Sequence, residues 1–526
     1  MTEQSNISQL SAQDAQFLYI QSATNLTHVM AVYIFDPSTA PGGKVRFKDI
    51  IEHMRKRMDV SPMFKRKLYR LPMDIDHPYW VKDEHFDLEA HISHGRLPAP
   101  GDWRQFCIHV ARHHSKPLDM TRPLWDMYVL EGLDNIPGYA KGSYAILTRI
   151  HHSTIDGVSG AHFFAAVSDK DPHGTPAIPL PEGESPANDL PTTSEILNRA
   201  INSTVTSPVK LAQALLKFAP ALVSSAQKSI TGGDEKTATG VPQTRFNGPV
   251  TPHKMFDAIT FDLDELKKMR RKVSDATIND VVLAICSGAL RHYLTKHKEL
   301  PKDSLVAVAP VNARSRSGDE ANPGNNISAM TIKIWSDIAD PVKRLEAIRD
   351  TTRETKAAKS GLSARIMTDL TKHIPGVTMA SVARILTDER FAPKMSNLMV
   401  SNVPGPQIQL YMNGAKLTHQ YGLAPLAHGM GLFIATPSYN GTISFNIISD
   451  RKMMPDIEFF RECLQRAFKE LRDAKPNAGA RQTKKTAVAP KKPLTPGDGS
   501  VMYRRVARKP RTVAAKAGGG GKPKVK

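Results

Sequence analysis

The sequence has few cysteines and no long apolar run. Its 526 residues include only three cysteines, Cys107, Cys286 and Cys463. They lie far apart without metal-ligand spacing, which argues against a disulfide framework and predicts buried free thiols. No stretch approaches the roughly 18 uninterrupted apolar residues that a membrane-spanning helix needs. Residues 1–9 are polar and lack the basic and apolar regions of a secretory signal, so we expect a cytoplasmic protein that does not cross a membrane.

The positive charge is concentrated near the end of the sequence. A net charge of +20 is typical of nucleic-acid binders. However, residues 475–526 hold fifteen Lys or Arg residues and one acid, Asp498. This segment can bury little apolar surface, so we predict a disordered basic tail over residues 474–526. The charge pattern leaves three roles open for it: attraction to anionic lipid headgroups, binding of nucleic acid, or solvation alone.

Proline and glycine divide the rest of the chain. We predict a first α/β lobe over residues 1–170, a linker over 171–254 that contains a helical segment, and a second lobe over 255–473. Apolar residues at helical spacing indicate the linker helix at about 194–230. In the second lobe we expect strands at 256–261, 305–311, 328–335, 431–436 and 442–449, and helices at 263–273, 278–295 and 456–473.

A histidine pair follows the compact apolar run of residues 142–150, which we predict to be a buried strand. The sequence continues as His151-His152-Ser153-Thr154-Ile155-Asp156-Gly157. A neutral imidazole can take a proton from a hydroxyl and return it to a leaving group. Asp156 could hold the loop through a salt bridge or orient the imidazole, and its spacing does not decide between these roles. Gly157 removes a side chain where a helix is expected to begin.

Two alternatives for the histidine pair are a metal site and a merely structural role. Neighbouring positions on a strand point to opposite faces, so His151 and His152 are poor co-ligands. No third ligand follows at a fixed spacing. A general base at a strand-to-helix turn is therefore the preferred interpretation, and no metal is expected.

The run matches the pattern His-His-x-x-x-Asp-Gly and resembles the CoA-dependent acyltransferase superfamily, which includes chloramphenicol acetyltransferase and peptide-synthetase condensation domains. Six further short segments resemble those of the bacterial wax ester synthase/diacylglycerol acyltransferase family and occur in the same order along the chain. These segments are Leu-Ser-Ala-Gln-Asp-Ala-Gln-Phe-Leu at 10–18, Arg-Pro-Leu-Trp at 122–125, Thr-Ile-Asn-Asp at 277–280, Pro-Val-Asn-Ala-Arg at 310–314, Gly-Asn-Asn at 324–326 and Ser-Asn-Val-Pro-Gly-Pro at 401–406.

This resemblance implies two chloramphenicol-acetyltransferase-like lobes, joined by the helical linker, with the active site between them. It implies that His152 is the general base, that Asp156 is structural and held by an arginine, and that His151 and Gly157 support the site. The substrates would be acyl-CoA and either a fatty alcohol or a diacylglycerol, with no metal or bound redox cofactor. Because both products are insoluble, we expect peripheral contact with the inner face of a membrane or with lipid inclusions.

Two other functions stay open: a condensation-domain-like enzyme with another acceptor, and a basic nucleic-acid- or membrane-binding protein with a non-catalytic body. Outside the histidine run, we expect structural roles. Asn279 and Asp280 would position the helix at 278–295, with Asp275 or Thr277 as its cap. Asn402, Pro404 and Gly405 would form a rigid turn at the lobe interface. Trp125 is expected in the core.

Overall fold

The computed structural model describes residues 8–71, 76–154, 164, 167–176, 194, 241–312, 327–358 and 396–476. These ranges belong to one compact unit that spans residues 1–480. The predicted tail lies outside the described residues except for its first three positions. The predicted linker helix lies outside them except for Ser194.

The first sheet is mixed and has six strands in the order β12-β13-β2-β7-β6-β5. Its pairs are antiparallel except for β5 and β6, which run parallel. Alternation along β2 explains its two buried faces: Val32 and Ile34 face one core cluster, while Tyr33 and Phe35 face the other. The strands are β2 (His28–Asp36), β5 (Ile92–Arg96), β6 (Trp125–Glu131), β7 (Tyr144–His151), β12 (Tyr411–Met412) and β13 (Ala415–Leu423).

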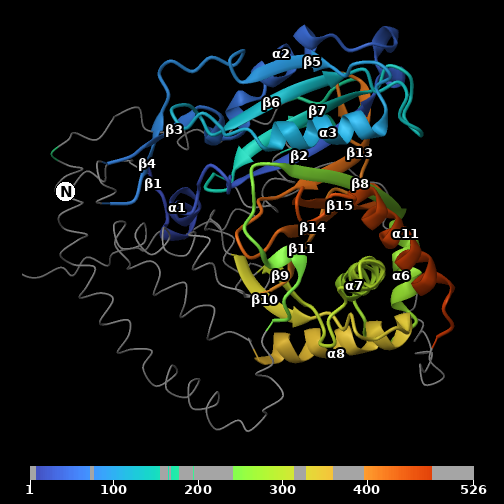
Figure 1. The fold of residues 1–526 in the computed structure, drawn as a ribbon. Helices are drawn as coiled ribbons and strands as arrows, with labels where there is room; N and C mark the ends of the chain where they lie inside the picture. The colour runs from blue at the N-terminus through green and yellow to red at the C-terminus, as the bar shows by residue number, and fades with distance from the viewer. Residues whose placement is uncertain are drawn as a thin grey trace, which may run out of the picture. The chain divides into compact units, whose positions relative to one another are not determined.

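Helix α3 (Trp103–His114) lies between the first sheet and strand β8 (Lys254–Asp262) of the second sheet (Figure 1). Its apolar residues Phe106 and Val110 are fully buried in a core cluster that also contains residues of β2 and β8. The indole nitrogen of Trp103 donates to Asp257 of β8 at 2.8 Å. A single helix therefore buries its two sides against both sheets. The opposite face of the first sheet is covered by α2 (Phe47–Arg55).

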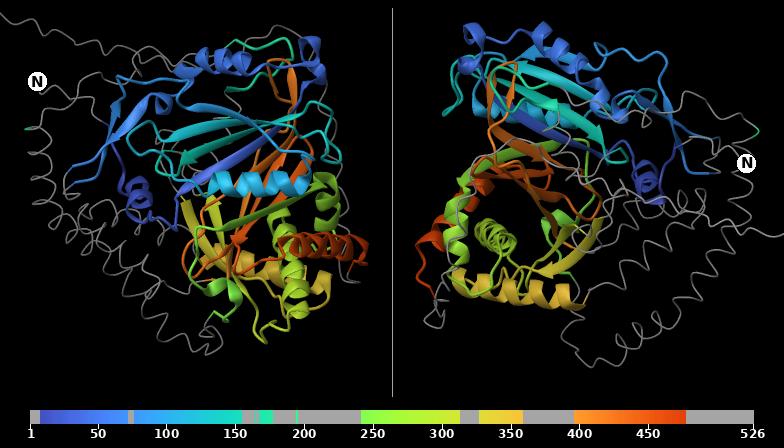
Figure 2. Two further views of the ribbon diagram at one scale, coloured as in Figure 1. Left: turned by 45° about the horizontal axis from the view of Figure 1, so that its top comes forward. Right: turned by 180° about the vertical axis from the view of Figure 1, so that it is seen from behind.

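The second sheet also has six strands, in the order β10-β9-β11-β14-β15-β8. Helix α7 (Ile278–Lys296) is buried over almost its whole length, and α6, α8 and α11 pack around it (Figure 2). The strands are β8 (Lys254–Asp262), β9 (Val306–Asn312), β10 (Ile327–Lys333), β11 (Leu398–Pro404), β14 (Leu432–Tyr439) and β15 (Thr442–Asp450). The other helices are α6 (Leu263–Arg270), α8 (Pro341–Ala358) and α11 (Ile457–Asp473).

The elements expected in the second lobe are confirmed within a few residues. The turn between β14 and β15 has positive φ at Asn440 (42°) and Gly441 (82°), as the Asn-Gly pair predicts for a hairpin. The mixed α/β class with two lobes is confirmed as well. The boundaries proposed for the domains stay a prediction.

Two strands cross the division that the sequence suggested. β12 and β13 lie within residues 255–473, but both belong to the first sheet, where β13 pairs with β2 from Lys416↔Asp36 to Leu423↔Met30. The pairing covers an edge of β2 that would otherwise expose unpaired backbone groups. The two sheets are therefore built from interleaved parts of the chain.

A small third sheet, with the order β1-β4-β3, lies beside helix α1 (Ala12–Tyr19) (Figure 1). Its strands are β1 (Ser8–Gln9), β3 (Arg66–Tyr69) and β4 (Tyr79–Lys82). Ala15 and Leu18 of α1 are buried with Leu124, and Trp80 of β4 packs against this cluster. The N-cap Ser11 accepts from the backbone of Asp14 at 3.1 Å, which fixes where α1 begins.

The prediction of a rigid turn at residues 401–406 is partly wrong. Asn402 and Pro404 belong to β11, which pairs with β14 as far as Pro404↔Ser438. Pairing of β11 with β9 stops at Met399, so the missing N–H of Pro404 breaks no ladder bond on that side. The chain leaves the strand at Gly405, where a Cβ atom would lie 2.3 Å from the carbonyl oxygen of Ser438.

The three cysteines are buried and free, as expected. Trp125 is 2% exposed and lies in the core, and its indole nitrogen donates to the carbonyl oxygen of Phe64 at 3.1 Å. Among the helices that the structure describes, none combines the length and the apolar character that a bilayer crossing requires.

Candidate active site

Strand β7 carries the histidine pair to the end of the first sheet. All eight of its residues are buried, and its last residue, His151, pairs with His28 of β2. The backbone N–H of His152 donates to the carbonyl oxygen of Thr27 at 3.0 Å. The backbone of His152, one residue beyond the end of β7, is therefore held by the residue that precedes β2.

The His151 side chain is fully buried and has hydrogen-bond partners at both ring nitrogens. Nδ1 lies 3.2 Å from the backbone N–H of Ser153 and accepts from it, so Nε2 carries the proton. Nε2 lies 2.9 Å from both Gln21 Oε1 and Thr27 Oγ1. Burial lowers the pKa of His151 to about 3, and the neighbouring His28 and His152 add to the effect. His151 is a neutral histidine that is locked in one orientation.

A buried polar layer continues from His151 along the sheet face that α3 covers. His28 Nε2 donates to the carbonyl oxygen of His114 at 2.8 Å, and burial lowers the pKa of His28 to about 4. Arg149, two residues before His151, donates to Asp126 through Nε at 2.9 Å and through a second, shorter bond. Arg149 also donates to the carbonyl oxygen of His113 at 3.0 Å. Buried polar groups of this kind are stable only when they are hydrogen-bonded.

His152 has a different environment, because its side chain is only half-buried. Its ring stacks on the ring of Phe17 from α1, with centroids 4.0 Å apart and planes 14° from parallel. Phe17 is itself tied to the histidine pair, since its carbonyl oxygen accepts from the hydroxyl of Thr27 at 2.8 Å. Of the two histidines, His152 is the one that is not fully buried.

The loop that holds the histidine pair also contacts the second half of the chain. The ammonium group of Lys254, at the start of β8, donates to the carbonyl oxygens of Thr24 at 3.3 Å and Thr251 at 2.6 Å. Burial lowers the pKa of Lys254 to about 8, against a smaller opposite effect of Asp450. The Thr24 hydroxyl lies 3.4 Å from His428 Nε2. A small pocket beside these groups is lined by Ala23, Thr24, Leu26, His114, Ser115, Pro252, Lys254, Pro425 and Leu426.

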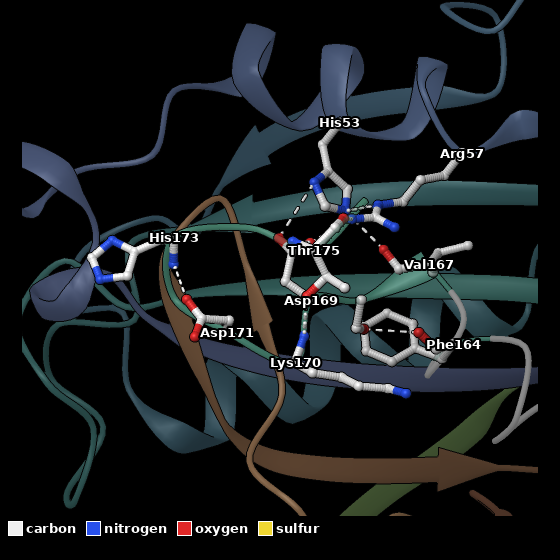
Figure 3. Close-up of polar contacts among 10 residues, drawn as sticks. His53, Arg57, Phe164, Val167, Asp169, Lys170, Asp171, His173 and Thr175 are labelled. Carbon is white, nitrogen blue, oxygen red and sulfur yellow. Dashed lines mark hydrogen bonds and ion pairs between the residues drawn. The ribbon is translucent and has the colours of Figure 1, made fainter. Parts of the chain in front are cut away.

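The chain that follows the histidine run is anchored by a second buried cluster (Figure 3). Asp169 pairs with Arg57 and accepts from the backbone N–H of Thr175 at 2.9 Å. Arg57 Nε donates to His53 Nε2 at 2.9 Å. Asp169 also exchanges two backbone hydrogen bonds of 2.8 Å with Tyr411, the first residue of β12. This cluster holds residues 167–176 beside α2.

The other predicted residues lie in separate places. Asp156 and Gly157 lie outside the described residues. Asp280 is buried at the start of α7, accepts from the hydroxyl of Thr277 at 2.7 Å and completes a capping box, while Asn279 is half-buried beside it. Within the described ranges, no three His, Cys, Asp or Glu side chains form a group that could hold a metal ion.

The sequence analysis did not identify the residues that surround the histidine pair. Phe17 belongs to the segment at residues 10–18 that resembles the family, but nothing near it in the sequence indicates that its ring reaches His152. Gln21 and Thr27 are common polar residues before a strand. Only the pairing of β2 with β7 brings Thr27 beside His151 and His152.

The fold consists of two mixed sheets with a helix between them, and the histidine pair lies at the end of a central strand of the first sheet. The model of the wax ester synthase/diacylglycerol acyltransferase catalytic domain matches residues 10–282, and that of the WS/DGAT C-terminal domain matches residues 323–472. The chain belongs to the WS/DGAT family of acyltransferases.

Individual relatives agree with this assignment. A Mycobacterium tuberculosis protein named "Putative diacyglycerol O-acyltransferase" is 31% identical over 88% of this chain and 89% of its own length. The solved wax ester synthase/diacylglycerol acyltransferase from Marinobacter aquaeolei VT8 has a TM-score of 0.63 and 26% identity, covering 88% of this chain and 98% of that one. A trichothecene 15-O-acetyltransferase from Fusarium sporotrichioides shares the fold, with a TM-score of 0.56 and 11% identity over 88% of this chain and 94% of that one.

Proposed function

We propose that this protein is an acyl-CoA-dependent O-acyltransferase that esterifies a long-chain fatty alcohol, a diacylglycerol, or both. The observation that carries the proposal is the contrast between the two adjacent histidines. His151 is buried, neutral and bonded at both ring nitrogens, whereas the half-buried ring of His152 meets its neighbour Phe17 face to face. In a family of acyltransferases, His152 is therefore the residue we assign as general base.

In the proposed mechanism, neutral His152 accepts the proton of the acceptor hydroxyl as the oxygen attacks the thioester carbonyl carbon. The C–O bond forms, the C–S bond breaks, and the imidazolium returns the proton to the departing thiolate. The products are an ester and free CoA, with no net change in protons. General-base catalysis of this kind contributes about 10²- to 10⁴-fold.

His151 supports this chemistry from the opposite side of the backbone. Because its ring bonds to Gln21, Thr27 and Ser153, it fixes the turn that presents His152. Asp156 and Gly157 are proposed as further supports, Asp156 through a salt bridge and Gly157 through the space that it leaves. Neither proposed role depends on a metal or a bound redox cofactor.

The choice of acceptor rests on the family and on the names of the relatives. Several relatives are named as diacylglycerol O-acyltransferases, including the Mycobacterium tuberculosis protein described above. Wax esters and triacylglycerols are both insoluble, so the enzyme would work at the surface of the inner membrane leaflet or of lipid inclusions. The basic tail would add attraction to anionic headgroups, worth up to about 1 kcal/mol per basic residue near the surface.

The deciding experiment offers labelled palmitoyl-CoA to the purified protein together with hexadecanol or a diacylglycerol, each alone. His152→Ala should lower ester formation by about 10²- to 10⁴-fold. His94→Ala is the matched control, because His94 is also a partly exposed histidine stacked on a phenylalanine, Phe47. Near-normal activity of His152→Ala would refute the base assignment. Ester formation with neither lipid, but turnover with an amine acceptor, would favour a condensation-type enzyme instead.

A further inference from the structure

Helix α1 places an aromatic ring directly on His152. The Phe17 and His152 ring centroids are 4.0 Å apart and the planes are inclined by 14°, so the rings lie face to face. This contact joins residues that are far apart in sequence and belong to different elements. It is separate from the hydrogen bonds that hold the backbone of the histidine pair.

Phe17 is held in place by the packing of α1 and by backbone hydrogen bonds through Thr27. On one side, the neighbouring α1 residues Ala15 and Leu18 are buried in a cluster with Leu124. On the other side, the Phe17 carbonyl oxygen accepts from Thr27, and the Thr27 carbonyl oxygen accepts from the N–H of His152. These two hydrogen bonds hold the backbone of Phe17 close to the backbone of His152, and the ring stack joins their side chains.

The face of an aromatic ring carries partial negative charge and attracts a cation within about 6 Å of its centroid. The 4.0 Å separation of the two rings is well inside that range. A neutral imidazole gains less from such a contact than an imidazolium does. An aliphatic side chain of similar size could fill the same space, but it would not distinguish between the two forms.

We infer that Phe17 is a positioning residue for His152, which orients the imidazole and favours its protonated form during acyl transfer. The inference rests on the proposed function, in which His152 becomes an imidazolium between attack on the thioester and release of the thiolate. Phe17 acts through His152 and does not itself touch the reacting atoms. Its loss should therefore lower kcat and leave KM for acyl-CoA nearly unchanged.

The test replaces Phe17 by leucine, which keeps an apolar side chain, and by tyrosine, which keeps the aromatic face. Phe17→Leu should lower kcat by about 2- to 30-fold, the factor that corresponds to a cation–π contact. Phe17→Tyr should restore most of this activity. Phe47→Leu is the matched control, because it removes the equivalent ring from His94, at a centroid distance of 4.9 Å. This control should leave kcat unchanged.

A second readout needs no turnover. The ring of His152 can be titrated by nuclear magnetic resonance, with its signal assigned by its absence in His152→Ala. Phe17→Leu should lower the midpoint by about half a pH unit or more, and Phe17→Tyr should return it. The adjacent titratable group, His151, is held neutral by burial and so contributes equally in all these variants.

Two results would overturn the inference: an unchanged His152 titration in Phe17→Leu, or no recovery of kcat and titration in Phe17→Tyr. If Phe17→Leu does not fold, pentafluorophenylalanine at position 17 keeps the shape of the ring while removing its negative face, and the same downward shift is expected. Failure of the proposed function is distinguishable, because full activity of His152→Ala would refute the base assignment without changing the titration results.

Discussion

The two sheets bury different kinds of residues against their helices. Between the first sheet and α3 lie His28, Arg149 and His151, each less than 5% exposed. The second sheet packs mainly apolar side chains against α7, whose buried residues run from Asp280 to Leu294 with few polar members. The first interface adds specific hydrogen bonds to its apolar contacts, whereas the second is formed chiefly by apolar burial.

The two regions therefore have different roles: the first positions the histidine pair, and the second stabilises the fold. The polar layer under the first sheet ends at the histidine pair, so its hydrogen bonds determine how His152 is presented. The apolar core around α7 contains no residue that we assign to the reaction. Changes in the first region should affect both folding and activity, whereas changes in the second should affect folding alone.

The largest effect on stability is expected for Arg149→Met. Removing the guanidinium leaves the Asp126 carboxylate without its two hydrogen bonds and strips a donor from the carbonyl oxygen of His113. Breaking a buried pair by deleting one partner costs about 3 to 5 kcal/mol, and we expect the lower value because Asp126 is partly exposed. Denaturant unfolding followed by fluorescence measures the loss, and activity per folded molecule should fall with it.

The control for Arg149→Met is Arg46→Met, which breaks the exposed pair of Arg46 with Asp49. Exposed pairs contribute little, so the unfolding midpoint of this variant should stay close to that of the original protein. Equal losses in the two variants would contradict the special role of the polar layer. Full activity per folded Arg149→Met molecule would contradict its link to the histidine pair.

Acid should weaken the first region in particular. Burial lowers the pKa of His28 to about 4 and that of His151 to about 3, while an unfolded histidine titrates near 6.5. Between these values the unfolded chain binds more protons, so stability is full above about pH 6.5 and is lost as the pH falls. For His28 alone, the loss between pH 7 and pH 5 is about 2 kcal/mol.

The measurement compares the unfolding free energy at pH 7 and pH 5 for the original protein and for His28→Gln. The variant should lose about 2 kcal/mol less over this interval, because one protonation site has been removed. Identical pH dependence in the two proteins would show that His28 does not resist protonation in the folded state.

The sequence predicted the second region better than the first, and the reason is physical. Local periodicity determines elements such as α7 and the β14–β15 hairpin, where apolar spacing, a cap and an Asn-Gly turn agree. The contacts of His152 depend on how distant strands pair. Nothing near Phe17 in the sequence reveals that its ring meets a residue at the end of β7.

The same reason explains the incorrect and missing predictions. The crossing of β13 into the first sheet depends on which strand offers a free edge, a property that no single segment carries. Residues 401–404 were expected in a turn because of their composition, but pairing with β14 extends them into a strand. The chemical capacity of the histidine pair could be predicted from residue types, whereas its supporting contacts could not.

The smallest effect is expected in the second region, for Thr277→Ala. Thr277 caps α7: its hydroxyl donates to Asp280 at 2.7 Å and accepts from the Asp280 backbone at 3.3 Å. Loss of such a cap costs about 1 kcal/mol. Asp280 keeps the hydroxyl of Thr352 as a partner at 2.7 Å, so the start of the helix should survive.

Thr277→Ser, which retains the hydroxyl, should recover most of the stability. Because α7 lies outside the polar layer, ester formation per folded molecule should equal that of the original protein. An activity loss that exceeds the loss of folded protein would instead place the start of α7 in the catalytic machinery and remove the distinction between the two sheets.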